Sequence, residues 1–80
     1  GMTVLEFIRQ HPAQAVDVIS SEGCGHVTPK RSMALARDRP EDLGVLDWTV
    51  GHSSFSAGAW HILAIAPAME QGPELTLAMS

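Results

Sequence analysis

Apolar residues recur at helical spacing near the start of the chain. Thr3 and Glu6 match a capping box, in which each side chain satisfies a backbone N–H that the first helical turn leaves free. Val4 and Ile8 then fall on one face of the same helix. This pattern predicts a helix over residues 3–11, which a proline at the next position ends.

Two further helices are expected before the pattern changes. The apolar stripe of Ala15, Val16 and Ile19 predicts a second helix over residues 12–23, which begins at a proline and ends among glycines and serines. A threonine followed by a proline, a common cap and first position of a helix, predicts a third helix over residues 29–39. One half of this third helix is mostly apolar and the other half is basic.

After the third helix the polarity of the chain alternates. Residues 46–50 alternate between apolar and polar, which is typical of a half-buried strand. A polar loop at residues 51–58 separates them from an apolar run at residues 60–66, which predicts a central strand. Residues 75–79 alternate again and predict a last strand. The expected fold is α+β, with three short N-terminal helices followed by a small antiparallel sheet of two to three strands, in one domain over residues 2–80.

This order of elements resembles the winged helix-turn-helix family of DNA-binding domains over residues 3–66. The stretch over residues 39–45, with acidic residues and a glycine before an apolar strand, is similar to that family's passage from recognition helix to first wing strand. The resemblance implies that residues 29–39 are the recognition helix and residues 51–58 the wing. The function it implies is transcription regulation through contact with duplex DNA.

The distribution of charge along the chain limits the expected DNA contact to one segment. The 80 residues hold five lysines and arginines against nine aspartates and glutamates, a net charge of −4, which excludes a generally basic nucleic-acid binder. Four of the five basic residues nevertheless fall within residues 30–39. We therefore expect Lys30, Arg31 and Arg37 to contact phosphates or guanine edges, because arginine presents a two-pronged donor to both.

The predicted wing would add contacts to the same DNA. His52, Ser53 and Ser54 lie in this segment and carry polar side chains suited to the phosphate backbone. The alternative for the basic helix is a solvated face, on which Arg37 and Arg39 pair with neighbouring acidic residues. The sequence leaves both alternatives open.

A different class of function also fits the sequence: a protein–protein interaction or dimeric adaptor module that binds no nucleic acid. Its partner would contact an exposed strand edge and Phe55, which stands alone among polar residues. For the DNA-binding function, a homodimer through the strand at residues 75–79 or through the first helix is expected, because one small module rarely reaches useful affinity. Trp48 and Trp60 are expected in the core, since a small chain has few other large side chains.

The candidates for chemistry are few. Cys24 and His26, with the distant His52 and His61, match none of the paired ligand spacings of zinc sites. A cysteine–histidine nucleophile at Cys24 and His26 would need a pocket that excludes water, for which an 80-residue chain has little depth. We therefore expect no enzyme, no catalytic residue, no metal site and no cofactor.

Composition and the chain ends complete the expectation. With 45% hydrophobic and 18% charged residues, the chain is too apolar to be disordered and fits one small globular domain. Its single cysteine excludes an internal disulfide and fits a reducing compartment. The longest apolar run, residues 62–68, is far too short for a membrane span, and no signal peptide is evident. Gly1 before Met2 resembles the remnant of a removed tag, and a cytoplasmic protein without membrane contact is expected.

Overall fold

The structure, a computed structural model, describes residues 1–67. The strand predicted at residues 75–79 lies outside these residues. The elements in chain order are α1 (Val4–Gln10), β1 (Ala15–Ser20), β2 (Gly23–Val27), α2 (Pro29–Arg37), the 3₁₀ helix η1 (Gly44–Asp47), β3 (Thr49–Ser56) and β4 (Ala59–Ile65).

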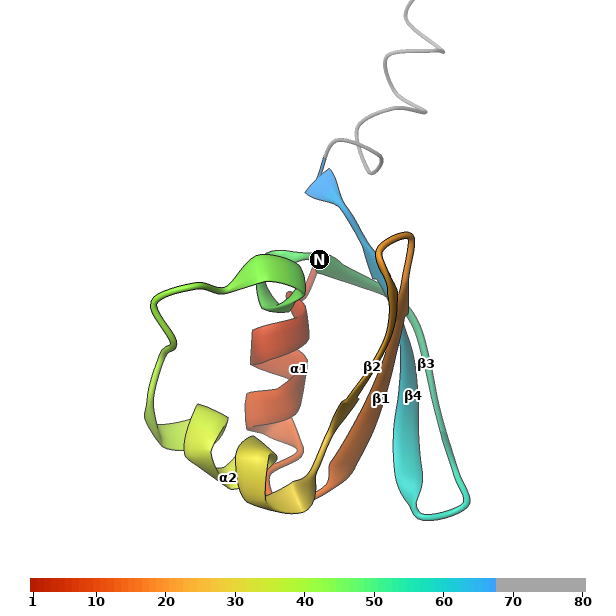
Figure 1. Cartoon of the computed structure of the whole chain (residues 1–80). Helices are drawn as coiled ribbons and strands as arrows, with labels where there is room; N and C mark the ends of the chain where they lie inside the picture. Colours follow the sequence, from red (N-terminus) through yellow and green to blue (C-terminus); the bar gives the residue numbers. More distant parts are fainter. Residues whose placement is uncertain (68–80) are drawn as a thin grey trace, which may run out of the picture.

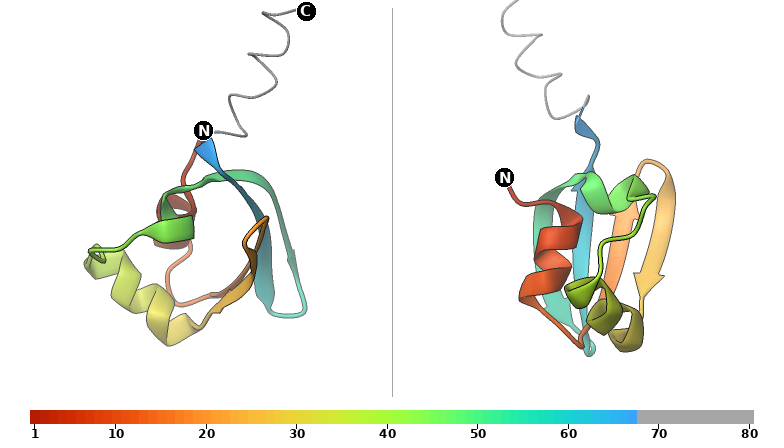
Figure 2. Two further views of the ribbon diagram at one scale, coloured as in Figure 1. Left: turned by 45° about the horizontal axis from the view of Figure 1, so that its top comes forward. Right: turned by 90° about the vertical axis from the view of Figure 1, so that its left-hand side faces the viewer.

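The four strands form one mixed sheet in the order β2-β1-β4-β3. The central strands β1 and β4 run parallel, whereas β1–β2 and β3–β4 are antiparallel pairs. Parallel neighbours need a crossover, and the chain passes through β2, α2, η1 and β3 before β4 returns beside β1. Figures 1 and 2 show α1, α2 and η1 on one side of this sheet. Within residues 1–67 the other side carries no helix, and we call it the uncovered face.

Three predicted elements are confirmed. α1 begins with the predicted capping box, in which the Thr3 hydroxyl accepts from the Glu6 N–H at 3.1 Å and the Glu6 carboxylate accepts from the Thr3 N–H at 2.8 Å. α2 begins after Thr28, whose hydroxyl accepts from the Arg31 N–H. The central strand predicted at residues 60–66 is β4. Cap signals and a continuous apolar run were therefore sufficient to predict these elements.

The predicted fold class is wrong. The structure is α+β with two helices interleaved with a four-stranded mixed sheet, not three N-terminal helices followed by a small antiparallel sheet. Residues 12–23, predicted as a helix, contain β1, in which the buried Val16 and Val18 alternate with the half-buried Asp17 and the exposed Ile19. β-Branched side chains suit a strand with neighbours on both sides, and this pairing outweighs the helical spacing of the apolar positions.

The predicted wing is not a loop either. Residues 51–56 belong to β3, which pairs with β4, and the turn between the two strands contains only Ala57 and Gly58, both with positive φ. The strand predicted at residues 46–50 is divided between η1 and the start of β3. The element order that carried the resemblance to winged helix-turn-helix domains is therefore not the order in the structure.

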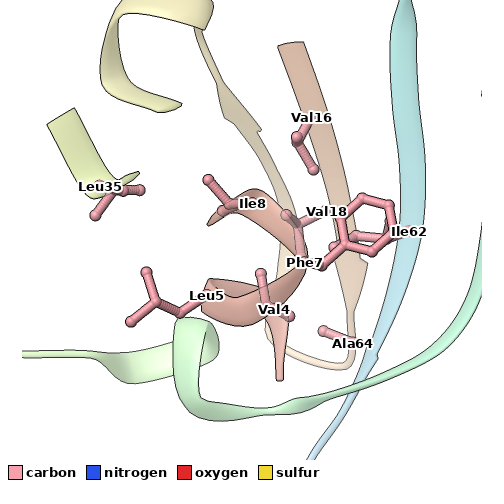
Figure 3. Packing of buried hydrophobic residues seen from close by; sticks show 9 residues of the cluster. All are labelled: Val4, Leu5, Phe7, Ile8, Val16, Val18, Leu35, Ile62 and Ala64. Carbon is pink, nitrogen blue, oxygen red and sulfur yellow. The ribbon is translucent and has the colours of Figure 1, made fainter. Parts of the chain in front are cut away.

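One small core lies between α1 and the sheet. Val4 and Ile8 of α1 and Val16 and Ile62 of the central strands are at most 1% exposed. Figure 3 shows the α1 side chains between the sheet and Leu35, which α2 contributes from the other side. The helices thus bury one face of the sheet, and the residues of its other face remain accessible.

Candidate functional site

Residues on the uncovered face form rows that cross all four strands. Asp17 and Ile19 point away from the helices because they alternate with the buried Val16 and Val18, and residues in register on neighbouring strands share their face. The polar row consists of His26, Asp17, His61 and Ser54. The apolar row consists of Cys24, Ile19, Leu63 and His52.

Ile19 and Leu63 form an exposed apolar pair at the centre of this face. They are direct neighbours in the parallel β1–β4 pairing, and they are 48% and 43% exposed. Single exposed aliphatic side chains are ordinary on a protein surface, whereas adjacent ones form a continuous patch. Covering the exposed half of each side chain would contribute about 1 kcal/mol.

Charge is nearly absent from the uncovered face. Among the charged side chains of residues 1–67, Asp17 alone lies on it. The others lie on α1, in the β1–β2 turn, on α2 or in the segment that leads to β3. A sheet face that is permanently in contact with water normally carries charged side chains, so this depletion is typical of a surface that becomes covered.

Asp17 is shared between two imidazoles. One of its carboxylate oxygens contacts Nδ1 of His26 on β2, and the other lies 3.3 Å from Nδ1 of His61 on β4. Nε2 of His61 lies 3.1 Å from the backbone carbonyl oxygen of Ser56. Asp17 therefore has a histidine partner on each neighbouring strand. The three side chains of this group are partly exposed and not buried.

The structure separates the two halves of the predicted DNA-binding site. Lys30, Arg31 and Arg37 are exposed on α2, on the helix side of the molecule. His52 and Ser54 lie on the uncovered face, whereas Ser53 pairs with Ile62 and shares the helix side of β3. Figure 1 shows α2 and β3 on opposite sides of the molecule.

The basic residues of α2 carry unneutralised charge. Within residues 1–67, Lys30, Arg31 and Arg37 of α2, and Arg39 just after the helix, form no ion pair, since the observed pairs are those of Asp17 with two histidines. The alternative in which Arg37 and Arg39 pair with neighbouring acidic residues is therefore not seen. The positive charge of α2 stays open to an external anion.

Phe55 lies on β3 and ends an aromatic cluster. Its ring is 51% exposed and lies 5.2 Å from that of Trp60, which in turn contacts the rings of Phe7 and His11. The Trp60 indole N–H donates to the side chain of Gln14 at 2.9 Å. Trp48 and Trp60 both pack against the core, as the sequence predicted. Phe55 thus covers the edge of Trp60 and is not isolated.

An apolar pocket of about 280 Å³ lies on the helix side between β2 and η1. Val18, Val45 and Leu46 form part of its wall. Gly25 pairs with Val18 and borders the same pocket, and a Cβ at this position would meet nothing within 4 Å. The pocket exists partly because β2 has no side chain at this position.

Cys24 and the histidines do not form a metal centre in the part of the chain that the structure describes. No group of three or more histidine, cysteine, aspartate or glutamate side chains there is arranged to hold a metal ion. Cys24 is an exposed free thiol beside Ile19, and both imidazoles of the polar row direct Nδ1 at a carboxylate.

Sequence reasoning missed Asp17, Ile19 and Leu63. It placed the first two on a helix and the third in a central strand covered on both faces. The signal that could have found them is the alternation of Val16 and Val18 with Asp17 and Ile19 in a β-branched stretch.

No helix within residues 1–67 combines the length and the apolar character needed to cross a membrane. Comparison of the chain with protein-family models, with curated proteins and with solved structures gives no match.

Proposed function

We propose that this chain is a protein-interaction module that associates with a second copy of itself through the uncovered face of the sheet. The observation that carries the proposal is the exposed pair of Ile19 and Leu63 at the centre of that face. Asp17, the one charged side chain of the face within residues 1–67, already has partners. Interface centres are likewise depleted in charge and make mainly apolar contacts.

Two copies of this face are complementary to each other. A two-fold axis beside the apolar pair brings Ile19 of each copy against Leu63 of the partner subunit. The polar rows of the two copies then lie against each other, with Asp17 of each copy facing His61 of the partner subunit, so that no unpaired like charges oppose each other. Two sheets that pack face to face lie about 10 Å apart, which lets side chains from both copies interdigitate.

The area of the face indicates a weak association. Four strands about 4.8 Å apart, each with five residues about 3.3 Å apart, cover about 300 Å² in each copy. Stable complexes bury about 800 Å² on each partner, so this interface belongs with the small, transient ones. We expect a dissociation constant of about 100 µM, which corresponds to about −5.5 kcal/mol.

Sedimentation equilibrium of the full chain, from about 10 µM to about 1 mM, tests this proposal. We expect a shift from monomer to dimer that Leu63→Lys abolishes, because the variant places two cations at the centre of the interface. Met33→Lys is the matched control, since Met33 is 45% exposed but lies on α2 on the helix side. A monomer at every concentration, or a dimer that Leu63→Lys leaves intact, would contradict the proposal.

A second candidate function is binding of duplex nucleic acid by α2, and the free charge of Lys30, Arg31 and Arg37 favours it. These side chains are exposed and have no acidic partner within residues 1–67. The segment that follows α2 is acidic and opposes phosphate. The expected binding is therefore weak, electrostatic and strongly dependent on salt.

Titration of a mixed-sequence duplex at about 50 mM salt and above tests this second function. We expect the Lys30→Ala/Arg31→Ala double variant to bind more weakly and to reduce the slope of log K against log salt by about two. Equal binding by the variant and the wild type, or no binding by either, would exclude α2 as the contact.

A further inference from the structure

We infer that the outer edge of β2 and the apolar pocket beside it form a binding site for an extended segment of this chain, residues 75–79, which adds to the sheet as a fifth strand. These residues lie outside the part of the chain that the structure describes, whereas the site that receives them consists of described residues. The site is separate from the uncovered face and does not depend on the proposed dimer.

The edge of β2 is open to another strand. Within residues 1–67, β2 pairs only with β1, so alternate backbone N–H and C=O groups along its other side have no strand beside them. Native edge strands commonly carry lysine, proline or a bulge, each of which opposes such pairing. Gly23–Val27 contains neither lysine nor proline, and its register with β1 is continuous. The backbone of β2 can therefore accept an added strand.

The pocket lies directly beside this edge. It is on the helix side, between β2 and the half-buried Val45 and Leu46 of η1. β2 presents Gly23 and Gly25 on this side, because Gly25 pairs with the buried Val18 and residues two apart share a face. A Cβ at either glycine would meet nothing within 4 Å. A strand added at the edge thus has space on its helix side for a large apolar side chain, which is how added strands gain specificity.

Residues 75–79 match this site in length and pattern. The segment is as long as β2, and its large apolar residues alternate with smaller ones: Leu75, Thr76, Leu77, Ala78 and Met79. In an extended conformation the two leucines and the methionine share one side. When the segment and β2 are aligned from end to end, Leu77 lies beside Gly25 and fills the pocket.

The described chain ends within reach of β2. β4 is parallel to β1, and a short turn joins β1 to β2, so the end of β4 and the start of β2 lie at the same end of the sheet (Figure 1). A position outside β2 is three strand spacings from β4, about 14 Å. Residues 66–74 span up to about 30 Å when extended, so they can cross this end and place residues 75–79 parallel to β2.

The same connection decides between this chain and a second copy. A short flexible tether gives the segment an effective concentration of about 1 mM at its own β2. Below that protein concentration, the segment of the same chain therefore occupies the edge in preference to the segment of another copy. The added strand also covers an edge that would otherwise pair with other chains.

Amide hydrogen exchange of the full chain with Leu63→Lys tests the inference, because this variant removes the contact of the proposed dimer. We expect the outward N–H groups of β2 to be protected about tenfold more than those of the other edge strand, β3. Their protection should stay below that of β1 and β4, since the segment can detach without global unfolding.

Two further substitutions in the same background identify the segment. Leu77→Glu would place a carboxylate in the apolar pocket, so the extra protection of β2 should be lost. Thr76→Glu is the matched control: it adds the same charge at the next position, on the opposite side of the segment, and should keep the protection. Gly25→Leu fills the pocket from β2 itself and should release the segment, while β1 and β4 stay protected.

The outcomes separate this inference from the proposed function. Outward amides of β2 that exchange as fast as those of β3, or protection that Leu77→Glu and Thr76→Glu change equally, would overturn the inference and leave the proposed dimer standing. Protection of β2 that rises with the concentration of Leu63→Lys, from about 20 µM to about 1 mM, would place the segment of a second copy at the edge and overturn the assignment to the same chain. A wild-type monomer at every concentration would instead contradict only the proposed function.

Discussion

At the scale of single residues, Thr3 and Glu6 hold the first turn of α1 through reciprocal hydrogen bonds. Thr3→Ala removes the acceptor for the Glu6 N–H, and such replacements at a helix N-cap cost about 1 kcal/mol. We expect the free energy of unfolding, measured by urea denaturation, to fall by that amount. Gln10→Ala, at an exposed position of the same helix, should change it by less than about 0.5 kcal/mol. Equal losses in both variants would mean that the cap contributes nothing specific.

The same capping box makes the stability of the fold depend on pH in the acidic range. Hydrogen bonds from the Thr3 backbone N–H and then from its hydroxyl lower the pKa of the Glu6 carboxyl in the folded chain. Because the folded-state pKa is below the unfolded one, ionised Glu6 stabilises the fold above the unfolded value, and this contribution is lost as pH falls through the folded value.

Urea denaturation at a series of pH values from about 6 down to about 3 measures this contribution. We expect Glu6→Gln to lose less stability than the wild type over this range, because the variant has no carboxylate to protonate. Glu22→Gln, in the exposed β1–β2 turn, serves as the comparison. Identical acid profiles for the wild type and Glu6→Gln would show that the cap does not depend on the ionised carboxylate.

At the scale of elements, α2 is attached to the core mainly through Leu35. Leu35 is 2% exposed, and its backbone carbonyl oxygen accepts from Nε of Arg9 at 3.0 Å. Leu35→Ala should lower the free energy of unfolding by about 3 kcal/mol, because a buried leucine is replaced by a cavity. Met33→Ala, at an exposed position of the same helix, should cost less than about 0.5 kcal/mol. Similar urea midpoints for the two variants would contradict the packing of α2.

Local signals predicted some elements and failed for others for a physical reason. A helix that begins with a cap, such as α1 or α2, is determined by residues a few positions apart. β1 is determined instead by its pairing with β2 and β4, and its contact with β4 joins segments far apart in the sequence. The spacing of Val16 and Ile19 fits a helix as well as a strand, so only that distant pairing decides.

The edge strand β3 was missed for a different reason, because its sequence is typical of a loop and not of a helix. Its residues 51–56 are all exposed and include three serines and a histidine, which is the composition of a loop. They form a strand because β4 offers them an unpaired edge, and their polar side chains suit a strand at the rim of the sheet. The candidate site could not be predicted either, because it requires the strand order: His26, Asp17 and His61 are neighbours only when β1 lies between β2 and β4.

At the scale of the whole molecule, the helices of residues 1–67 cover one face of the sheet and leave the other to water. A chain this small buries only about 60% of the surface that its unfolded form exposes, so its stability is modest. Covering the apolar pair by a second copy adds burial where the fold itself has none. Association and folding should therefore be coupled, because a partner that binds only the folded chain stabilises it.

Amide hydrogen exchange measures this coupling. β1 and β4 have a strand on each side, so their amides should exchange most slowly and only through global unfolding, whereas the outer amides of β2 and β3 should exchange faster. With a dissociation constant of about 100 µM, raising the wild type from about 20 µM to about 1 mM should stabilise it by about 1 kcal/mol and slow exchange in β1 and β4 about fivefold. Leu63→Lys should show the same order among strands but no dependence on concentration, while Met33→Lys should behave as the wild type. If the exchange rates of the wild type do not change with protein concentration, association does not stabilise the fold, and the coupling is contradicted.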